Sequence, residues 1–271
     1  THYNNRDHRK ILVIDGKAAF SGGINLADEY INKEERFGKW KDNCFLLQGD
    51  AVRNYTLMFL QLWNTTVSQD AKLYQPYVSV RSDRVPREGD GFIIPYGDGP
   101  HSPVSVAQSI YLNIIHSAVD YVHIMTPYLV LDDEMLNALK RAAKSGIDVR
   151  ILLPYIPDKK TVNLIGKTYY PELLEAGVHI YEYTPGFVHS KVVEADGNIA
   201  AVGTINLDFR SLYLHYECAC LIFENDVLKD ITEDFHRTFA DSHRITMSDY
   251  KKMNLMKRFA GRVLRVFAPQ V

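Results

Sequence analysis

The stretch HSKVVEADGNIAAVGTIN, from His189 to Asn206, has an earlier counterpart in HRKILVIDGKAAFSGGIN, from His8 to Asn25. Both copies read H-x-K-x4-D-x6-G-x2-N, and they are offset by 181 residues. One such match is a weak motif, but two extended copies in the same register indicate an internal duplication. The shared positions are His8, Lys10, Asp15, Gly22 and Asn25 in the first copy and His189, Lys191, Asp196, Gly203 and Asn206 in the second.

The composition excludes several broad classes of protein. A chain of 271 residues, 46% hydrophobic and 24% charged, can bury a large core, which argues against disordered, collagen-like and coiled-coil proteins. Its formal net charge of -2 is not that of a dedicated nucleic-acid binder, so no nucleic acid is expected as a partner. No apolar run approaches the roughly 20 residues that span a bilayer. The three cysteines show no metal-ligand spacing.

Apolar patterning predicts alternating helices and strands, and therefore an α/β fold. Around the second copy we expect strands at 92–95, 121–125, 149–153, 178–183, 188–194 and 199–202 and around Cys218. Helices are expected after Pro103, from Asp132 or Asp133 to Gly146, near 160–176 and from Asp226 to about Ala240. Around the first copy the pattern predicts strands at 10–14 and 44–47 and a helix from Asp50 to about Trp63.

The two copies differ in what precedes them. About 97 residues of regular pattern lead up to His189, whereas only seven residues precede His8. We therefore expect the N-terminal half of the duplication to be truncated in this chain. The expected divisions are 1–70 as the C-terminal portion of the first half, 71–91 as a connecting segment, 92–245 as the second half and 246–271 as a basic amphipathic C-terminal helix.

The expected C-terminal helix has two different faces. Apolar residues fall on one face, and basic residues on another; the apolar set is Met256, Phe259, Val263, Leu264 and Phe267, and the basic set is Arg258, Arg262 and Arg265. Such a helix can lie on an anionic membrane surface. The alternative is a helix that packs on its own domain and leaves its basic face in solvent.

The duplicated motif suits phosphodiester chemistry. Residues two apart in a strand share a face, so His8 projects with Lys10, and His189 with Lys191. If the halves pack about a pseudo-twofold axis, two imidazoles and two ammonium groups meet in one pocket. Fixed cations can neutralise a phosphate as the transition state develops. Neither motif carries the clustered carboxylates of a metal cage, so no metal and no cofactor is expected.

Two histidines in one site can divide a displacement reaction. One neutral ring attacks phosphorus, and the other, protonated, donates to the leaving alcohol. Carboxylates that bond the outer ring nitrogens would orient each ring, and Asp42 and Glu217 are the candidates, with solvent-facing carboxylates as the alternative. Asp15 and Asp196 complete the motifs, but at strand ends a structural role suits them better than direct chemistry.

Small residues follow each motif. Gly22 and Gly23 in the first copy, and Gly203 and Thr204 in the second, fit a turn or a phosphate contact, and both can hold at once. The asparagines of the two motifs, Asn25 and Asn206, are expected to bind the substrate.

These residues resemble the phospholipase D superfamily, and most closely the bacterial cardiolipin synthases. The resemblance also covers three segments outside the paired motifs, Trp40-Lys41-Asp42, Thr126-Pro127-Tyr128 and Asn206-Leu207-Asp208-Phe209-Arg210-Ser211. It implies a duplicated α-β-α sandwich with mixed sheets and one shared active site, which reacts through a phosphohistidine.

The resemblance also implies a reaction and a place for it. The reaction is phosphatidyl transfer between two phosphatidylglycerol molecules, giving cardiolipin and glycerol, at the bacterial cell membrane. His8 would be the nucleophile and His189 the acid, with the reverse assignment open. Lys10, Asn25, Lys191 and Asn206 would hold phosphate oxygens.

Other functions remain open from the sequence. The same four catalytic side chains could serve another phospholipase D-like phosphodiesterase, either a phospholipid hydrolase or a nuclease. A non-catalytic membrane-binding scaffold is less favoured because both motifs are intact. The partners expected are phosphatidylglycerol and an anionic membrane surface, and the oligomeric state is open.

Overall fold

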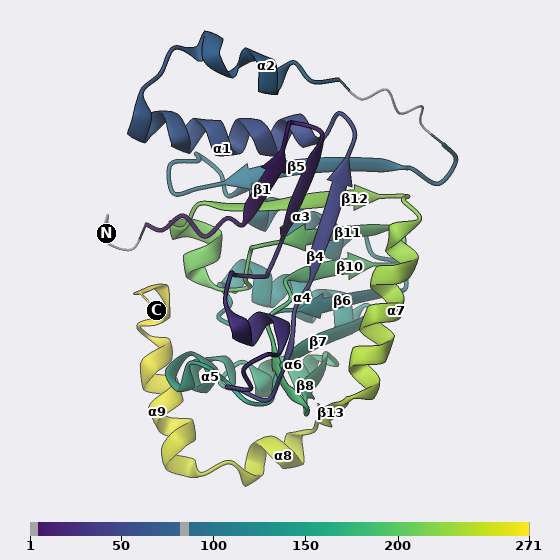
Figure 1. Cartoon of the computed structure of the whole chain (residues 1–271). Coiled ribbons are helices and arrows are strands. Elements are labelled where there is room, and N and C mark those ends of the chain that lie inside the picture. Colours follow the sequence, from purple (N-terminus) through teal and green to yellow (C-terminus); the bar gives the residue numbers. More distant parts are fainter. Residues whose placement is uncertain (1–4, 82–86, 271) are drawn as a thin grey trace.

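A large mixed sheet forms the centre of the computed structural model, which describes residues 5–81 and 87–270. Its eight strands follow the order β13-β8-β7-β6-β10-β11-β12-β5 (Figure 1). The pairs β6–β7 and β7–β8 are parallel, and the other pairs are antiparallel. The strands are β5(Phe92–Asp98), β6(Tyr121–Met125), β7(Asp148–Pro154), β8(His179–Tyr183), β10(Val192–Ala195), β11(Ile199–Gly203), β12(Glu217–Phe223) and β13(Ser242–Ile245).

Each face of this sheet buries a separate core. Alternate residues of β7 point to opposite faces: Ile151 joins the core under the helices α3(Val106–Ser117), α4(Asp133–Lys144) and α6(Tyr170–Ala176), and Leu152 joins the other. That second core lies under α7(Val227–Ala240) and a smaller sheet (Figure 1). The arrangement is the layered α/β fold that the sequence predicts.

The smaller sheet repeats part of the larger one. Its strands β1(Ile11–Ile14), β2(Ala18–Gly22) and β4(Cys44–Gln48) form an antiparallel meander, followed by the helix α1(Val52–Val67). The second half has the same order in β10, β11, β12 and α7. There β10 also pairs with β6, and β12 with β5. Among the described residues, β1 and β4 have no such outer neighbours.

Three expected elements are broken in the structure. The helix expected near 160–176 is two helices, α5(Lys160–Gly166) and α6, because a proline at its start sets the first turn of α6. The motif strand expected at 188–194 is divided into β9(Gly186–Val188) and β10, so the residues of the H-x-K triplet lie between strands. The region 246–271 is not one helix, because a capping box at Thr246 begins α8(Met247–Lys252) before α9(Leu255–Arg265).

The two halves meet through short crossed contacts. The strand β3(Lys39–Lys41) pairs in parallel with β9, which brings Trp40 beside Phe187 at a ring distance of 4.7 Å. A second contact between the halves is the isolated parallel β-bridge of Asp7 with Tyr216. Among the helices of residues 5–81 and 87–270, none is long and apolar enough to cross a membrane.

Candidate active site

Each motif histidine is anchored by the other half of the chain. The backbone N–H of His189 donates to the carbonyl of Lys41 at 2.7 Å. The backbone N–H of His8 donates to the carbonyl of Tyr216 at 2.9 Å. In both cases the acceptor directly precedes a carboxylate residue, Asp42 or Glu217, so each histidine is held beside a carboxylate from the opposite half.

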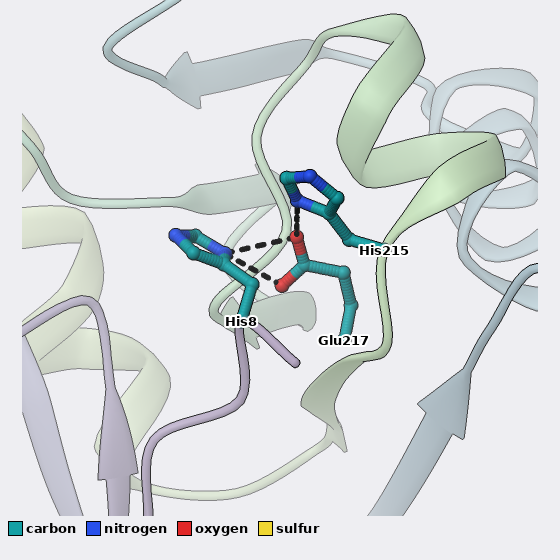
Figure 2. A group of neighbouring side chains, drawn as sticks. All are labelled: His8, His215 and Glu217. Carbon is teal, nitrogen blue, oxygen red and sulfur yellow. Dashed lines mark hydrogen bonds and ion pairs between the residues drawn. The ribbon is translucent and has the colours of Figure 1, made fainter. Parts of the chain in front are cut away.

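The side chains repeat this crossing. The Nδ1 atom of His8 lies 2.9 Å from both carboxylate oxygens of Glu217 (Figure 2). The Nδ1 atom of His189 lies 2.7 Å from Oδ2 of Asp42. Both carboxylates are buried, so the solvent-facing alternative is wrong. The bonded Nδ1 atoms leave Nε2 of each ring as the nitrogen for chemistry.

Both carboxylates remain ionised in this environment. Burial opposes their ionisation, but the neighbouring histidines outweigh it. The rings of His215 and His8 help to lower the pKa of Glu217 to about 2. The hydrogen bond with His189 holds the pKa of Asp42 below its usual value. Two fixed negative charges therefore orient the two imidazoles.

The two histidines differ in exposure. His189 packs among Tyr30, Trp40 and Phe187, with ring distances of 5.2, 5.4 and 5.9 Å. Burial, with the nearby charge of Lys191, lowers the pKa of His189 to about 3. The side chain of His8 is 25% exposed to solvent. At neutral pH the ring of His189 is therefore uncharged.

The two motif lysines lie in matching positions. Nζ of Lys10 donates to the carbonyl of His8 at 2.5 Å, and Nζ of Lys191 donates to the carbonyl of His189. Burial lowers the pKa of both ammonium groups, that of Lys191 to about 7. The charges of the two lysines also act on each other, which places the two motifs in one electrostatic environment. A bound anion would restore the full positive charge of both.

The two motif asparagines differ in their hydrogen bonds. Asn206 is 6% exposed, and its Oδ1 atom has no hydrogen-bond partner among the described residues. Nδ2 of Asn25 donates to the hydroxyl of Tyr30 at 2.5 Å, and that ring stands edge-on to His189. This placement is compatible with substrate binding by both asparagines.

The small residues serve close packing. A Cβ on Gly203 would lie 2.4 Å from the carbonyl of Cys218, and one on Gly22 would lie 2.3 Å from the carbonyl of Asn43. A Cβ on Gly23 would lie 2.1 Å from Oδ1 of Asp42. Gly22 and Gly203 end strands, so neither occupies the simple turn considered from the sequence. These glycines let backbone approach the carboxylate-bearing segments.

Thr204 positions a carboxylate. Its hydroxyl donates to Oε2 of Glu217, and the hydroxyl oxygen Oγ1 accepts the backbone N–H of Cys218 at 3.1 Å. Thr204 is fully buried. The hydroxyl of Thr204 therefore bonds Glu217, rather than being free for the expected phosphate contact.

The motif aspartates lie away from the histidines, at the far ends of β1 and β10. The carboxylate of Asp196 accepts backbone N–H groups of Val119, Asp120 and Tyr121 at 2.8–2.9 Å. Asp15 is exposed in the turn after β1. Both adopt a left-handed backbone conformation, with φ of 52° and 53°. This geometry supports the structural role and opposes their inclusion among the catalytic residues.

A third histidine belongs to the cluster and was missed from the sequence. Nδ1 of His215 lies 3.7 Å from Oε1 of Glu217, and its ring lies 5.7 Å from that of His8 (Figure 2). Its position two residues before Glu217, on the same face of an extended segment, was the available signal. Possible ligand atoms of His8, His215 and Glu217 lie within 4.8 Å of one another, a donor set that suits a transition metal ion. Both oxygens of Glu217 already accept hydrogen bonds, however.

The chain is similar to several known proteins. The domain family "Cardiolipin synthase, PLD-like domain" matches residues 111–239. "Cardiolipin synthase 2" of Bacillus anthracis is 40% identical over 98% of this chain and 51% of its own length. "Cardiolipin synthase" of Geobacillus kaustophilus is 41% identical over 98% of this chain and 52% of its own. An uncharacterized protein of Streptococcus mutans is 52% identical over 99% of this chain and 58% of its own.

A solved structure shares the whole fold. Phosphatidylserine synthase of Haemophilus influenzae superposes with a TM-score of 0.71 at 14% identity, covering 99% of this chain and 70% of that one. At this identity the likeness shows the fold alone. The chain spans about half the length of the curated relatives that it matches.

Proposed function

We propose that this chain, whose residues 111–239 match the cardiolipin synthase type of phospholipase D-like domain, has a site that transfers a phosphatidyl group between two phosphatidylglycerol molecules. The products are cardiolipin and glycerol. The observation that carries the proposal is the crossed pair of histidine–carboxylate contacts, His8 with Glu217 and His189 with Asp42. The proposed place of the reaction is the bacterial cell membrane.

The proposed reaction has two displacements. Nε2 of one histidine attacks phosphorus, the phosphorus–oxygen bond to glycerol breaks, and the second histidine gives its proton to the departing glycerol oxygen. That second ring then takes the proton of a hydroxyl on another phosphatidylglycerol, whose oxygen displaces the histidine from phosphorus. Lys10, Lys191 and the two asparagines hold the phosphate oxygens throughout.

The burial of His189 bears on which histidine is the nucleophile. The lowered pKa of His189 keeps its ring uncharged at neutral pH, which favours His189 as nucleophile, opposite to the assignment that the family resemblance implies. Rapid quenching and peptide mapping of the phosphorylated histidine decide between them. Label on His189 supports the assignment from burial, and label on His8 supports the assignment from resemblance.

Exposed apolar side chains lie close in sequence to Asn25 and Tyr30, which supports a lipid acceptor. Leu26 follows Asn25 and is fully exposed, and Ile31 and Tyr155 are more than half exposed. Gly38 lies close to the segment of Tyr155, since its Cβ position would lie 3.1 Å from the side chain of Ile156. Exposed apolar side chains on these segments suit an acceptor that arrives with acyl chains, rather than water or a polynucleotide.

Turnover in phosphatidylglycerol vesicles without added metal tests the proposal. Cardiolipin and glycerol as products support the transferase. Phosphatidic acid would indicate a hydrolase, and tight lipid binding without turnover would indicate a scaffold. The variants His8→Ala and His189→Ala should each lose activity by roughly a thousandfold or more, and retention of activity in either one contradicts the two-histidine scheme.

A further inference from the structure

The helix α9 presents large apolar side chains to solvent. Met256 is 80% exposed and Phe259 is 71% exposed. With a spacing of three to four residues, these side chains form one stripe along the helix and its C-terminal end. The full set, which we call the α9 apolar stripe, is Leu255, Met256, Phe259, Val263, Val266 and Phe267.

The helix is held on its domain by the opposite face. Gly261 is buried there, and a Cβ on it would lie 2.8 Å from the carbonyl of Leu164 in α5. The guanidinium of Arg265 lies 3.9 Å from the ring centre of Tyr169 and bonds Glu172 at 3.1 Å. Arg258 similarly lies over the ring of Tyr250 at 4.7 Å.

This orientation reverses one expectation from the sequence. A helix packed on its domain was expected to turn its apolar face inward and its arginines outward. Instead, stacking on tyrosine rings turns two arginines inward, and of the expected apolar set only Leu264 packs against the core. The apolar stripe therefore remains uncovered in the described chain.

The charge around the stripe is positive. The segment Leu255–Arg265 contains Lys257, Arg258, Arg262 and Arg265 and no acidic residue, although the whole chain has a net charge of -2. Lys251 and Lys252 precede it and are exposed. An apolar stripe flanked by cations is complementary to a bilayer with anionic headgroups.

A series of contacts connects the helix to the surroundings of His189. It packs against α5, which begins directly after Asp158 and Lys159. Asp158 accepts a hydrogen bond from Tyr128 at 2.6 Å. After burial, the charges of Asp42 and Asp158 help to raise the pKa of Tyr30, whose ring lies beside His189. Seating α9 in a lipid surface would therefore bring the site close to that surface.

We infer that the α9 apolar stripe inserts into the interface of an anionic bilayer and holds the protein there. The apolar side chains enter the headgroup–acyl boundary, and Lys257 and Arg262 contact the headgroups. The inference rests on the proposed function only in the choice of phosphatidylglycerol as the anionic lipid. It assigns the stripe to a lipid surface rather than to a second copy of the chain.

Vesicle flotation of the protein tests the inference, with Phe259→Ser/Val266→Ser compared with Val104→Ser/Val119→Ser. The control pair removes exposed apolar side chains elsewhere, at 64% and 75% exposure. Binding to mixed phosphatidylglycerol–phosphatidylcholine vesicles should weaken roughly tenfold or more in the stripe variant and less than about twofold in the control. Pure phosphatidylcholine vesicles should bind the unsubstituted protein weakly, and added salt should reduce binding to the anionic vesicles.

Two results would overturn the inference. One is equal vesicle binding by the stripe variant and the control. The other is a dimer, measured by sedimentation, that the stripe variant abolishes while vesicle binding is unchanged. Vesicle binding without any phosphatidyl transfer would contradict the proposed function and leave the inference standing. Loss of binding with intact turnover of dispersed short-chain phosphatidylglycerol is the expected behaviour of the stripe variant.

Discussion

Glu217 and Asp42 each serve a histidine of the other half. Their positions, 28 residues after His189 and 34 residues after His8, identified them as candidates from sequence alone. These spacings could not show which histidine each carboxylate contacts. The two residues lead into equivalent strands of the two halves, so the same spacing fits contact with the histidine of the same half or of the other half. The crossing depends on how the halves dock, through β3 with β9 and Asp7 with Tyr216, which is long-range information.

The crossed pairing predicts separate effects of two conservative variants. Glu217→Gln should perturb the ring resonances of His8, with its neighbour His215, and Asp42→Asn those of His189, because each removes one ionic partner. Activity should fall roughly a hundredfold to ten-thousandfold in each variant, as a ring that loses its orienting carboxylate is less well placed. Long-range ¹H–¹⁵N correlation of labelled histidine is the measurement. A response of His189 to Glu217→Gln, with His8 unchanged, would refute the crossing.

The buried ammonium group of Lys191 carries an unfavourable charge. Burial lowers its pKa from 10.5 to about 7, so between these values the unfolded chain binds more protons than the folded one. The free energy of unfolding should therefore gain a contribution that rises with pH from about 7 to 10.5. Below that window the folded protein bears the full cost of a buried ammonium.

Lys191→Met should consequently stabilise the protein while it abolishes activity. We expect a higher melting temperature near pH 7 and a flatter dependence of stability on pH between 7 and 10. Inorganic phosphate should raise the melting temperature of the unsubstituted protein but not that of the variant. A variant that is less stable than the parent at pH 7, or that phosphate still stabilises equally, contradicts this role of Lys191.

The strands and helices were largely predictable because apolar periodicity is local. The strand at 121–125 and the helix begun by Asp132 agree with the structure. The prediction was wrong where two or three residues interrupt a periodic run. Such interruptions divide α5 from α6 and α8 from α9, and they place His189 and Lys191 between strands. Turn chemistry and tertiary packing override periodicity at these points.

The close approach of strands β11 and β12 at Gly203 leads to a prediction about stability. A methyl group at Gly203 would collide with the backbone of β12, whereas one at Gly97 in β5 would meet only ordinary contacts at 3.5 Å or more. We expect Gly203→Ala to destabilise the fold by ~1–3 kcal/mol and Gly97→Ala to cost less. Urea denaturation measures both. Equal midpoints for the two variants would show that the close approach of β11 and β12 does not need glycine.

At the scale of the whole molecule, the two sequence copies converge although their histidines are 181 positions apart. Charge coupling between Lys10 and Lys191, and the crossed carboxylates, make one site from two motifs. The duplication predicted this convergence. It could not predict His215, or the outward apolar stripe of α9, because both depend on packing between elements that the periodic pattern does not connect.

A structure of the protein with vanadate, a stable mimic of the pentacoordinate phosphorus, tests the shared site most directly. We predict one vanadate, bonded to Nε2 of His8 or His189, with Nε2 of the other ring on the opposite side and both lysine ammonium groups on its equatorial oxygens. Two vanadates in separate sites, or one that contacts a single motif, would contradict the account.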